Sequence, residues 1–432
     1  INAALVAALV ETRGLKPAEC EIDFGMDAIG NLAHRGVLAG DWPTIGKRLA
    51  DAVRSLKDKG FKGPFLTCDT RPYHEAGASE AQELAVALAT GVAYLRALTE
   101  NGLSGTEASQ AISFTHAIDS DQFLGLAKLR ALRHLWARVE EASGITPQPI
   151  CINAESAWRM LTRRDPWVNM LRATLATFAA GVGGANSMTV LPHTMALGLP
   201  DGFARRVARN TQSVLLEESN LWRVADPAAG AGGYEALTDE LAGAAWALFQ
   251  DIESKGGILE SLCAGHIQGL IGEVREDREK DIARRKFAIT GTSEFPLLGE
   301  GGVEVLDVSA DPKRGIPAGG DGKPDLGFGA LIDALADGAA LAEVTPGREL
   351  TTKAAALTSA RMSEPFEILR DAAEQHKEKS GKYPQVFLAS LGVIAAHTAR
   401  STWMKNLLAA GGIEALTSEG YASAEDTAAA FK

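Results

Sequence analysis

The feature that most constrains the fold is a pattern repeated between residues 20 and about 190. A short apolar run suited to a buried strand is followed by a polar loop and then by a long helix with amphipathic spacing. This order is typical of parallel βα units, in which each helix carries the chain back to begin the next strand. The runs that fit such strands are residues 21–24, 64–68, 111–115, 148–154 and 185–190.

Capping signals mark where the helices begin. Ser79 followed by Gln82 predicts a capping box for a helix that reaches Asn101. Asp119 is predicted to cap the next helix, which we expect to end near Gly144. The apolar side chains expected to pack that helix on a sheet are Phe123, Leu126, Ala127, Leu129, Leu132, Leu135, Trp136 and Val139.

Five successive βα units are compatible with an open doubly wound sheet or with part of a (β/α)₈ barrel. The barrel is favoured because no G-x-G-x-x-G follows the first strand and because polar residues gather in the loops after the strands. Those loops are residues 69–79, 116–121 and 155–166. Since five units cannot close a barrel, we expect an N-terminal part of it to be absent from this chain.

The length of 432 residues predicts more than one domain, because single cores stop growing at about 250–300 residues. Residues 1–290 are expected to form the barrel, and residues 291–380 a linker with short helices. The linker is rich in Gly, Pro and Asp between 291 and 347, with one helix predicted at 330–341. Residues 381–432 would begin a second α/β domain, with a strand at 386–391 and a helix at 397–410.

Charge and cysteine content narrow the partners and the compartment. There are 43 Lys plus Arg against 55 Asp plus Glu, and the net charge of −12 disfavours nucleic acids and anionic membranes as partners. No stretch reaches the roughly 18–20 apolar residues that span a bilayer. The four cysteines form no C-x-x-C pair, so no zinc site or other metal site is predicted and a cytoplasmic location fits best.

Tyr73 and His74 are the candidates for catalysis that position suggests. They follow a predicted strand directly, where the catalytic groups of a barrel lie, and a histidine there could polarise a carbonyl or transfer a proton. The alternative is a loop histidine that hydrogen-bonds only to backbone.

A long segment, RVARNTQSVLLEESNLWRVADPAAGAGGYEALTDELA, is unusually specific. It resembles the adenosylcobalamin-dependent acyl-CoA mutases of the methylmalonyl-CoA mutase family. The segments YHEAGASEAQELA, RRDPWVNMLRATLATFAAGVGGANS and FAITGTSEFP share this resemblance. The similarity runs in order from about Leu15 to Gly420.

The resemblance implies a (β/α)₈ barrel through which a CoA ester passes, joined by a linker to a flavodoxin-like cobalamin domain. It also implies a radical rearrangement of the carbon skeleton. Adenosylcobalamin supplies the radical chemistry, and the protein supplies a shaped cavity that excludes water.

The cobalamin motif of catalytic members is degenerate in this chain. Those members carry Lys-x-x-x-Asp-x-His-x-x-Gly, whose His ligates cobalt and whose Asp orients that His. These four positions fall on Ser390, Ile394, Ala396 and Ala399. His397 lies one residue away and is interpreted as a histidine at the start of a helix.

The motifs of the barrel have also lost some of their polar residues. The Tyr and His of catalytic members fall on Arg71 and Pro72, so Tyr73 and His74 are displaced from the family positions. The motif His-x-Gln-Thr-Ser-Gly-Trp falls on residues 152–158, which keep the Ser and Trp but lose the His and Gln. The motif Gly-Gly-Thr-Gln-Ser-Leu-His becomes GGANSMT at residues 183–189.

These losses predict the small, non-catalytic subunit of a heterodimeric methylmalonyl-CoA mutase. Adenosylcobalamin and the acyl-CoA would then be bound in the complex by the large catalytic subunit. One alternative is a divergent active mutase that uses Tyr73 and His74, with cobalamin held by a separate protein. Another is a barrel that binds acyl-CoA for regulation. Whether this chain alone is an enzyme, and which acyl-CoA is preferred, stays open.

Overall fold

The computed structural model describes residues 1–307, 326–345 and 349–431, and its main sheet has parallel strands in the order β2-β3-β4-β5. Residues 24–26 run beside β2, because Met26 forms a parallel bridge with Leu66 and the Phe24 N–H donates to the Pro64 carbonyl. The predicted parallel units are therefore confirmed, although the first segment is bridged only at Met26. The strands are β2 (Leu66–Asp69), β3 (Ile112–Ile118), β4 (Cys151–Ser156) and β5 (Ser187–Thr189).

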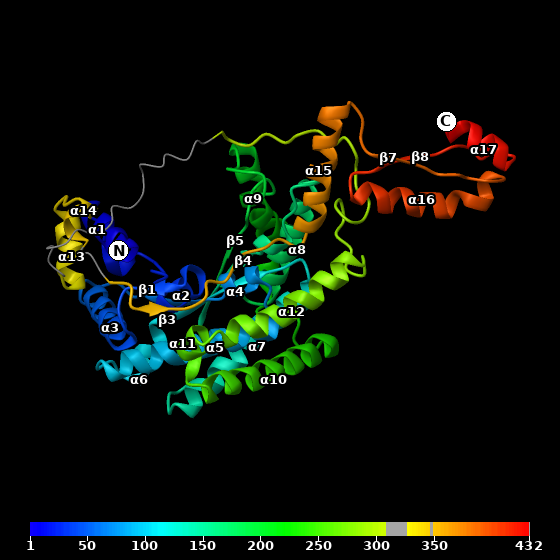
Figure 1. Ribbon diagram of the computed structural model, residues 1–432. Helices are drawn as coiled ribbons and strands as arrows, with labels where there is room; N and C mark the ends of the chain where they lie inside the picture. The colour runs from blue at the N-terminus through cyan, green and yellow to red at the C-terminus, as the bar shows by residue number, and fades with distance from the viewer. Residues whose placement is uncertain (308–325, 346–348, 432) are drawn as a thin grey trace.

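Helices pack on this sheet and on one another (Figure 1). They are α1 (Asn2–Thr12), α2 (Ala28–Arg35), α3 (Trp42–Asp58), α4 (Arg71–Ala76), α5 (Glu80–Glu100), α6 (Gly105–Gln110), α7 (Gln122–Ala142), α8 (Val168–Val182), α9 (Gly202–Ser213), α10 (Gly232–Ser254), α11 (Gly257–Cys263) and α12 (His266–Ala283). The helices α5 and α8 contact the strands, and α10 packs across α5 and α7. Among the described residues, no helix combines the length and apolar character needed to cross a bilayer.

The helix starts test the capping predictions. The capping box of Ser79 and Gln82 is present at the start of α5, as predicted. The prediction that Asp119 caps the following helix is wrong, because the Asp121 carboxylate accepts the Leu124 N–H there instead. Phe123 was also expected in the core but is 59% exposed and stacks on Tyr234. It lies in the first turn of α7, where the helix extends past the sheet.

The two faces of the sheet differ in polarity. Successive side chains of a strand point to opposite faces, and the parallel register aligns equivalent positions across strands. One face is apolar and buried, and it carries Leu66, Cys68, Ile112, Phe114, Ile118, Ile152 and Ala154. The other face is called the polar face here, and it carries Thr67, Asp69, Ser113, Thr115, Cys151, Asn153, Glu155, Ser187 and Thr189.

The sheet is curled around its polar face. Asp23 and Asn153 lie on segments three strand positions apart, which in a flat sheet would be about 14 Å. Nevertheless the Asn153 amide donates to the Asp23 carboxylate at 2.7 Å. The polar side chains also bond to their neighbours, as Thr67 and Thr115 do at 2.9 Å. The polar face is therefore concave.

The C-terminal part returns over the sheet and then projects away from it (Figure 1). It contains α13 (Phe328–Ala336), α14 (Leu341–Val344), β6 (Thr352–Lys353), which pairs with β1 (Val37–Leu38), α15 (Glu364–Ser380), β7 (Gln385–Phe387), α16 (Ile394–Ala410), β8 (Glu414–Leu416) and α17 (Ala424–Phe431). Strands β7 and β8 are parallel. The helix predicted at 397–410 is confirmed and begins at Ile394, whereas the strand predicted at 386–391 is limited to Gln385–Phe387. The single helix predicted at 330–341 is divided into α13 and α14. Most of PAGGDGKPDLGFG lies outside the described residues.

Helix α15 is attached to the sheet by a cluster of ion pairs, called the clasp here. Arg164 pairs with Asp371 at 2.6 Å and with Glu374 at 2.7 Å. Arg163 pairs with Glu367 at 3.2 Å, and Arg361 pairs with the same carboxylate at 2.7 Å. Because Arg163 and Arg164 follow β4, the clasp fixes α15 near the carboxyl ends of the strands.

Removing the buried anion of the clasp should destabilise the protein far more than removing its exposed neighbour. Glu367 is 1% exposed in its side chain, whereas Glu364 is 42% exposed, lies 3.6 Å from the Arg361 guanidinium and accepts the Arg361 backbone N–H at 3.1 Å. We expect Glu367→Ala to lower the free energy of unfolding by about 3–5 kcal/mol, because it removes the carboxylate that pairs closely with the buried guanidinium of Arg361. Glu364→Ala should cost less than about 1 kcal/mol. Urea unfolding of the complete protein measures both, and equal losses would contradict the clasp.

Candidate functional site

An arginine bridges two strand ends at the rim of the polar face. Arg71 begins α4 directly after β2, and its guanidinium donates to both carboxylate oxygens of Asp69, at 2.9 and 2.7 Å. It also donates to Glu155 at the end of β4, at 2.8 Å. Burial raises the pKa of Glu155, although Arg71 opposes that shift. The bridge spans β3 and joins the ends of β2 and β4.

A carboxyl group beside this bridge titrates near neutrality. Asp27 caps α2, and it accepts the Gly30 N–H at 2.8 Å and the Asp69 N–H at 3.2 Å. The Tyr94 hydroxyl also donates to it. Burial, helped by the charge of Asp69, raises the pKa of Asp27 to about 7 despite these donors. Asp27 is therefore the group in this region suited to exchanging a proton at neutral pH.

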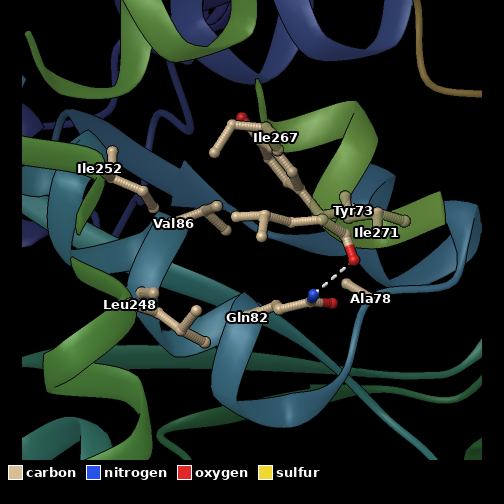
Figure 2. Close-up of a pocket in the computed structure, with 10 residues that line it drawn as sticks. Tyr73, Ala78, Gln82, Val86, Leu248, Ile252, Ile267 and Ile271 are labelled. Carbon is tan, nitrogen blue, oxygen red and sulfur yellow. Dashed lines mark hydrogen bonds between the residues drawn. The ribbon is translucent and has the colours of Figure 1, made fainter. Parts of the chain in front are cut away.

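Tyr73 and His74, the candidates from sequence, lie among helices rather than on the polar face. Tyr73 is 1% exposed, and burial raises the pKa of its hydroxyl well above the ordinary value. It lines a cavity of about 10 Å³ with Gln82, Val86 and Ile267, which Figure 2 shows. The cavity has room for roughly one water molecule. No described group hydrogen-bonds to the Tyr73 hydroxyl.

His74 belongs to a buried group of charges beneath the sheet. Its Nδ1 bonds to the Glu83 carboxylate, and Lys128 donates to the same carboxylate at 3.1 Å. Burial acts to raise the pKa of Glu83, but His74 and Lys128 more than offset it and hold that pKa well below the ordinary value. Burial lowers the pKa of His116, whose Nδ1 lies 3.0 Å from the Thr70 hydroxyl.

A second buried pair adjoins this group. Arg159 donates to Asp119 at 3.1 Å, and Asp119 lies 3.6 Å from Nε2 of His74. Burial opposes ionisation of Asp119, yet His74 and Arg159 keep its pKa below the ordinary value. This is the actual role of the aspartate that was expected to cap α7.

One set of described side chains could hold a metal ion by geometry alone. His74, Glu80 and Glu83 each place a ligand atom within 4.8 Å of the others. Both carboxylates already have cationic partners, because Lys128 pairs with Glu83 and Arg159 lies 3.6 Å from Glu80. The cluster is thus balanced by protein cations, and its geometry is that of a structural network joining α4, α5 and α7.

The positions aligned with the cobalamin motif lie between β7 and the first turns of α16. Ser390 is buried, and its hydroxyl lies 3.3 Å from the Ser401 hydroxyl. Ile394, Ala396 and Ala399 are exposed, and their side chains carry no atom that could bind a metal or a polar cofactor group.

His397 lies beside these positions but is turned into the fold. Its ring is buried, both ring nitrogens lack partners among the described residues, and Nε2 lies close to Gly420. A metal-binding histidine is normally oriented by a hydrogen bond from its second nitrogen to a carboxylate, carbonyl or water. The residues present therefore do not fit a cobalt-ligating site.

Sequence reasoning missed the buried charges and the arginine bridge. A signal existed for Lys128, which interrupts the apolar run from Gly125 to Leu132 on a helix that packs on the sheet. A lysine there is seldom buried unless it is paired. Glu83 stands 45 residues away in sequence, so the pair could be assigned only from the structure.

Comparison with known proteins gives a consistent result. Residues 1–314 match the sequence profile of a family described as methylmalonyl-CoA mutase. The methylmalonyl-CoA mutase small subunit of Streptomyces virginiae is 42% identical over 424 residues, covering 98% of this chain and 62% of that protein. The small subunit of Propionibacterium freudenreichii subsp. shermanii is 43% identical over 314 residues, covering 71% of this chain and 48% of that protein.

A more distant relative is described as a methylmalonyl-CoA mutase, with no mention of a subunit. The methylmalonyl-CoA mutase of Escherichia coli (strain K12) is 35% identical over 250 residues, covering 56% of this chain and 35% of that protein. The chain spans less than two thirds of the length of each of these relatives.

The depressed carboxyl pKa values predict acid sensitivity. Since the folded pKa of Glu83 lies below its unfolded value, its stabilising contribution is complete above about pH 4.5 and is lost as the pH falls further. We expect Glu83→Gln to lose about 3–5 kcal/mol of stability at pH 6, because His74 and Lys128 remain buried. Its thermal midpoint should then fall less between about pH 5 and 3 than that of the unaltered protein.

The exposed Glu141→Gln, on the last turn of α7, is the matched control and should keep the original acid slope. An unchanged slope in Glu83→Gln would show that the buried carboxylate is not the titrating group.

Proposed function

This chain belongs to the methylmalonyl-CoA mutase family, and from that premise we propose that it forms part of a small, non-catalytic subunit. The subunit would support a larger catalytic partner that interconverts methylmalonyl-CoA and succinyl-CoA. The 42% identity across 98% of this chain to a protein described as a small subunit carries this conclusion. Together the two subunits would form an isomerase, and a cytoplasmic location is part of the proposal.

The architecture proposed for residues 1–290 is part of a (β/α)₈ barrel. A parallel sheet that curls around a polar concave face, with helices on its apolar face, has the form of a barrel wall. Asn153 reaching Asp23 across the concave side supports this form, because the two segments face each other as opposed wall positions do. In this family a CoA ester would pass along such an interior.

The rim of the polar face supports a non-catalytic role. Arg71 occupies the position that aligns with a tyrosine of catalytic members, and it is held by Asp69 and Glu155. This arrangement closes the strand ends with an ion-pair bridge instead of exposing a proton donor. Chain residues here hold one another in place, and none is assigned a step in the rearrangement.

Adenosylcobalamin would supply radical chemistry when bound, and we propose that the partner binds it. Residues 381–432 would begin a flavodoxin-like domain, since β7, α16 and β8 form a βαβ unit. The first turns of α16 offer Ile394, Ala396 and Ala399 in place of polar groups, and His397 is buried against Gly420. The donor set does not fit the cofactor.

The two alternatives have weaker support. A divergent active mutase would need Tyr73 and His74 to reach a substrate, but Tyr73 lines a cavity among helices and His74 is bonded to Glu83. A regulatory barrel that binds acyl-CoA would use the polar face. Calorimetry with the CoA ester on the complete protein separates regulation from a purely structural role.

Because the partner is proposed to bind adenosylcobalamin, we expect this subunit to bind none. Titration of the complete protein with adenosylcobalamin should leave the visible spectrum equal to the sum of the separate spectra. His397→Ala should give the same result, because His397 is not a ligand. A spectral shift that His397→Ala abolishes would overturn the assignment of the cofactor to the partner.

Association with the catalytic subunit should be measurable by mixing. The catalytic partner alone should have a lower thermal midpoint or lower activity than the mixture, because binding to the folded state stabilises it. A complex with a stable interface should also elute as a single heterodimer. A partner that is equally active and stable without this subunit contradicts the proposal.

A further inference from the structure

We propose that a cavity beside α12 binds a short-chain carboxylate. The cavity has a volume of about 160 Å³ and lies between the α4–α5 turn, α12 and the segment that leads into α15. It is separate from the polar face, from the Tyr73 cavity and from the turn after β7. The inference does not rest on the proposed function.

Arginines dominate the polar lining of the cavity. Four of them line it, together with three glutamates. Arg361 is paired with Glu367 at 2.7 Å, and Arg275 with Glu279 at 2.7 Å. The four arginines are Arg159, Arg275, Arg278 and Arg361.

Two of the guanidinium groups meet at one carbonyl oxygen. Arg159 donates to the Ala78 carbonyl at 2.8 Å, and Arg278 approaches the same oxygen at 3.5 Å. Arg159 is compensated by Asp119 at 3.1 Å. Like charges held this close destabilise each other unless an anion lies nearby.

Arg278 is the arginine of this cavity that we expect to bind the ligand. Its remaining contact is with the Gly77 carbonyl at 2.6 Å, and no carboxylate in the described part of the chain forms an ion pair with it. Burial, with a smaller effect of Arg159, lowers its pKa, and the more distant carboxylates of Glu80, Asp119 and Glu83 oppose this shift. A half-buried guanidinium that donates only to carbonyl groups can still accept a directly bonded anion.

The backbone at Gly77 is built to bring α12 this close. Gly77 has a φ of +116°, and an added Cβ would lie 2.8 Å from Cβ of Arg275. Its carbonyl also receives Arg278. A side chain at this position would push α12 outward and separate the arginines from the cavity.

The other residues that line the cavity indicate which kind of anion fits. A planar guanidinium matches the two oxygens of a carboxylate. A doubly charged phosphate is disfavoured because Glu75 and Glu364 also line the cavity, and because Arg159, Arg275 and Arg361 already pair with carboxylates. The apolar part of the lining suits a short alkyl chain, and it consists of Ala76, Ile282, Ala360, Met362, Pro365 and Ile368.

Ligand-observed NMR on the complete protein tests the site with butyrate and its neutral isostere butyramide. Butyrate should bind saturably, and butyramide at least tenfold more weakly, because the guanidinium needs an anion. Arg278→Gln should weaken butyrate binding at least tenfold. Arg284→Gln, at the exposed end of the same helix, should leave it unchanged.

Equal binding of butyrate and butyramide, tighter binding of inorganic phosphate, or unaltered affinity in Arg278→Gln would each overturn the assignment. Should Arg278→Gln lower the thermal midpoint, Arg278→Lys keeps the charge without the planar fork. That variant should fold and bind butyrate with intermediate affinity. An affinity equal to that of the unaltered protein would also contradict the proposed guanidinium contact.

Discussion

The difference in polarity between the two faces of the parallel sheet constrains the rest of this structure. A strand places alternate side chains on opposite faces, so four strands in parallel register concentrate apolar residues on one side and hydroxyl, amide and carboxylate groups on the other. Helices cover the apolar side. The polar groups bond to one another between adjacent strands and, because the sheet curls, also across the concave face, as the bond from Asn153 to Asp23 demonstrates.

The parallel strands and the boundaries of α5 were predictable because their signals are local. The capping box at Ser79 depends on residues three positions apart, and the buried runs of the strands are short and continuous. The start of α7 was not predictable, because Asp119 and Asp121 are equally suited to capping by residue type. Packing decided between them, because Arg159 and His74 interact with the Asp119 carboxylate and leave Asp121 to cap the helix.

The candidate site was less accessible to sequence reasoning, for a related reason. Several of its contacts join residues far apart in the chain, such as Arg71 with Glu155 and Lys128 with Glu83. Family resemblance located the missing cofactor ligands but could not tell whether neighbouring residues replaced them. The exposed alanines at 396 and 399 and the inward-facing His397 are what the structure adds.

The clasp between the RRD segment and α15 has a practical consequence for dividing this protein into fragments. Arg163 and Arg164 belong by sequence to the sheet, but their counter-charges at 367, 371 and 374 come from a helix that a boundary drawn from composition would assign to the linker. A fragment that stops before residue 364 leaves several partly buried arginines without anions. The smallest fragment that keeps this region intact therefore ends after α15, so that the autonomous unit of folding is longer than the sheet itself.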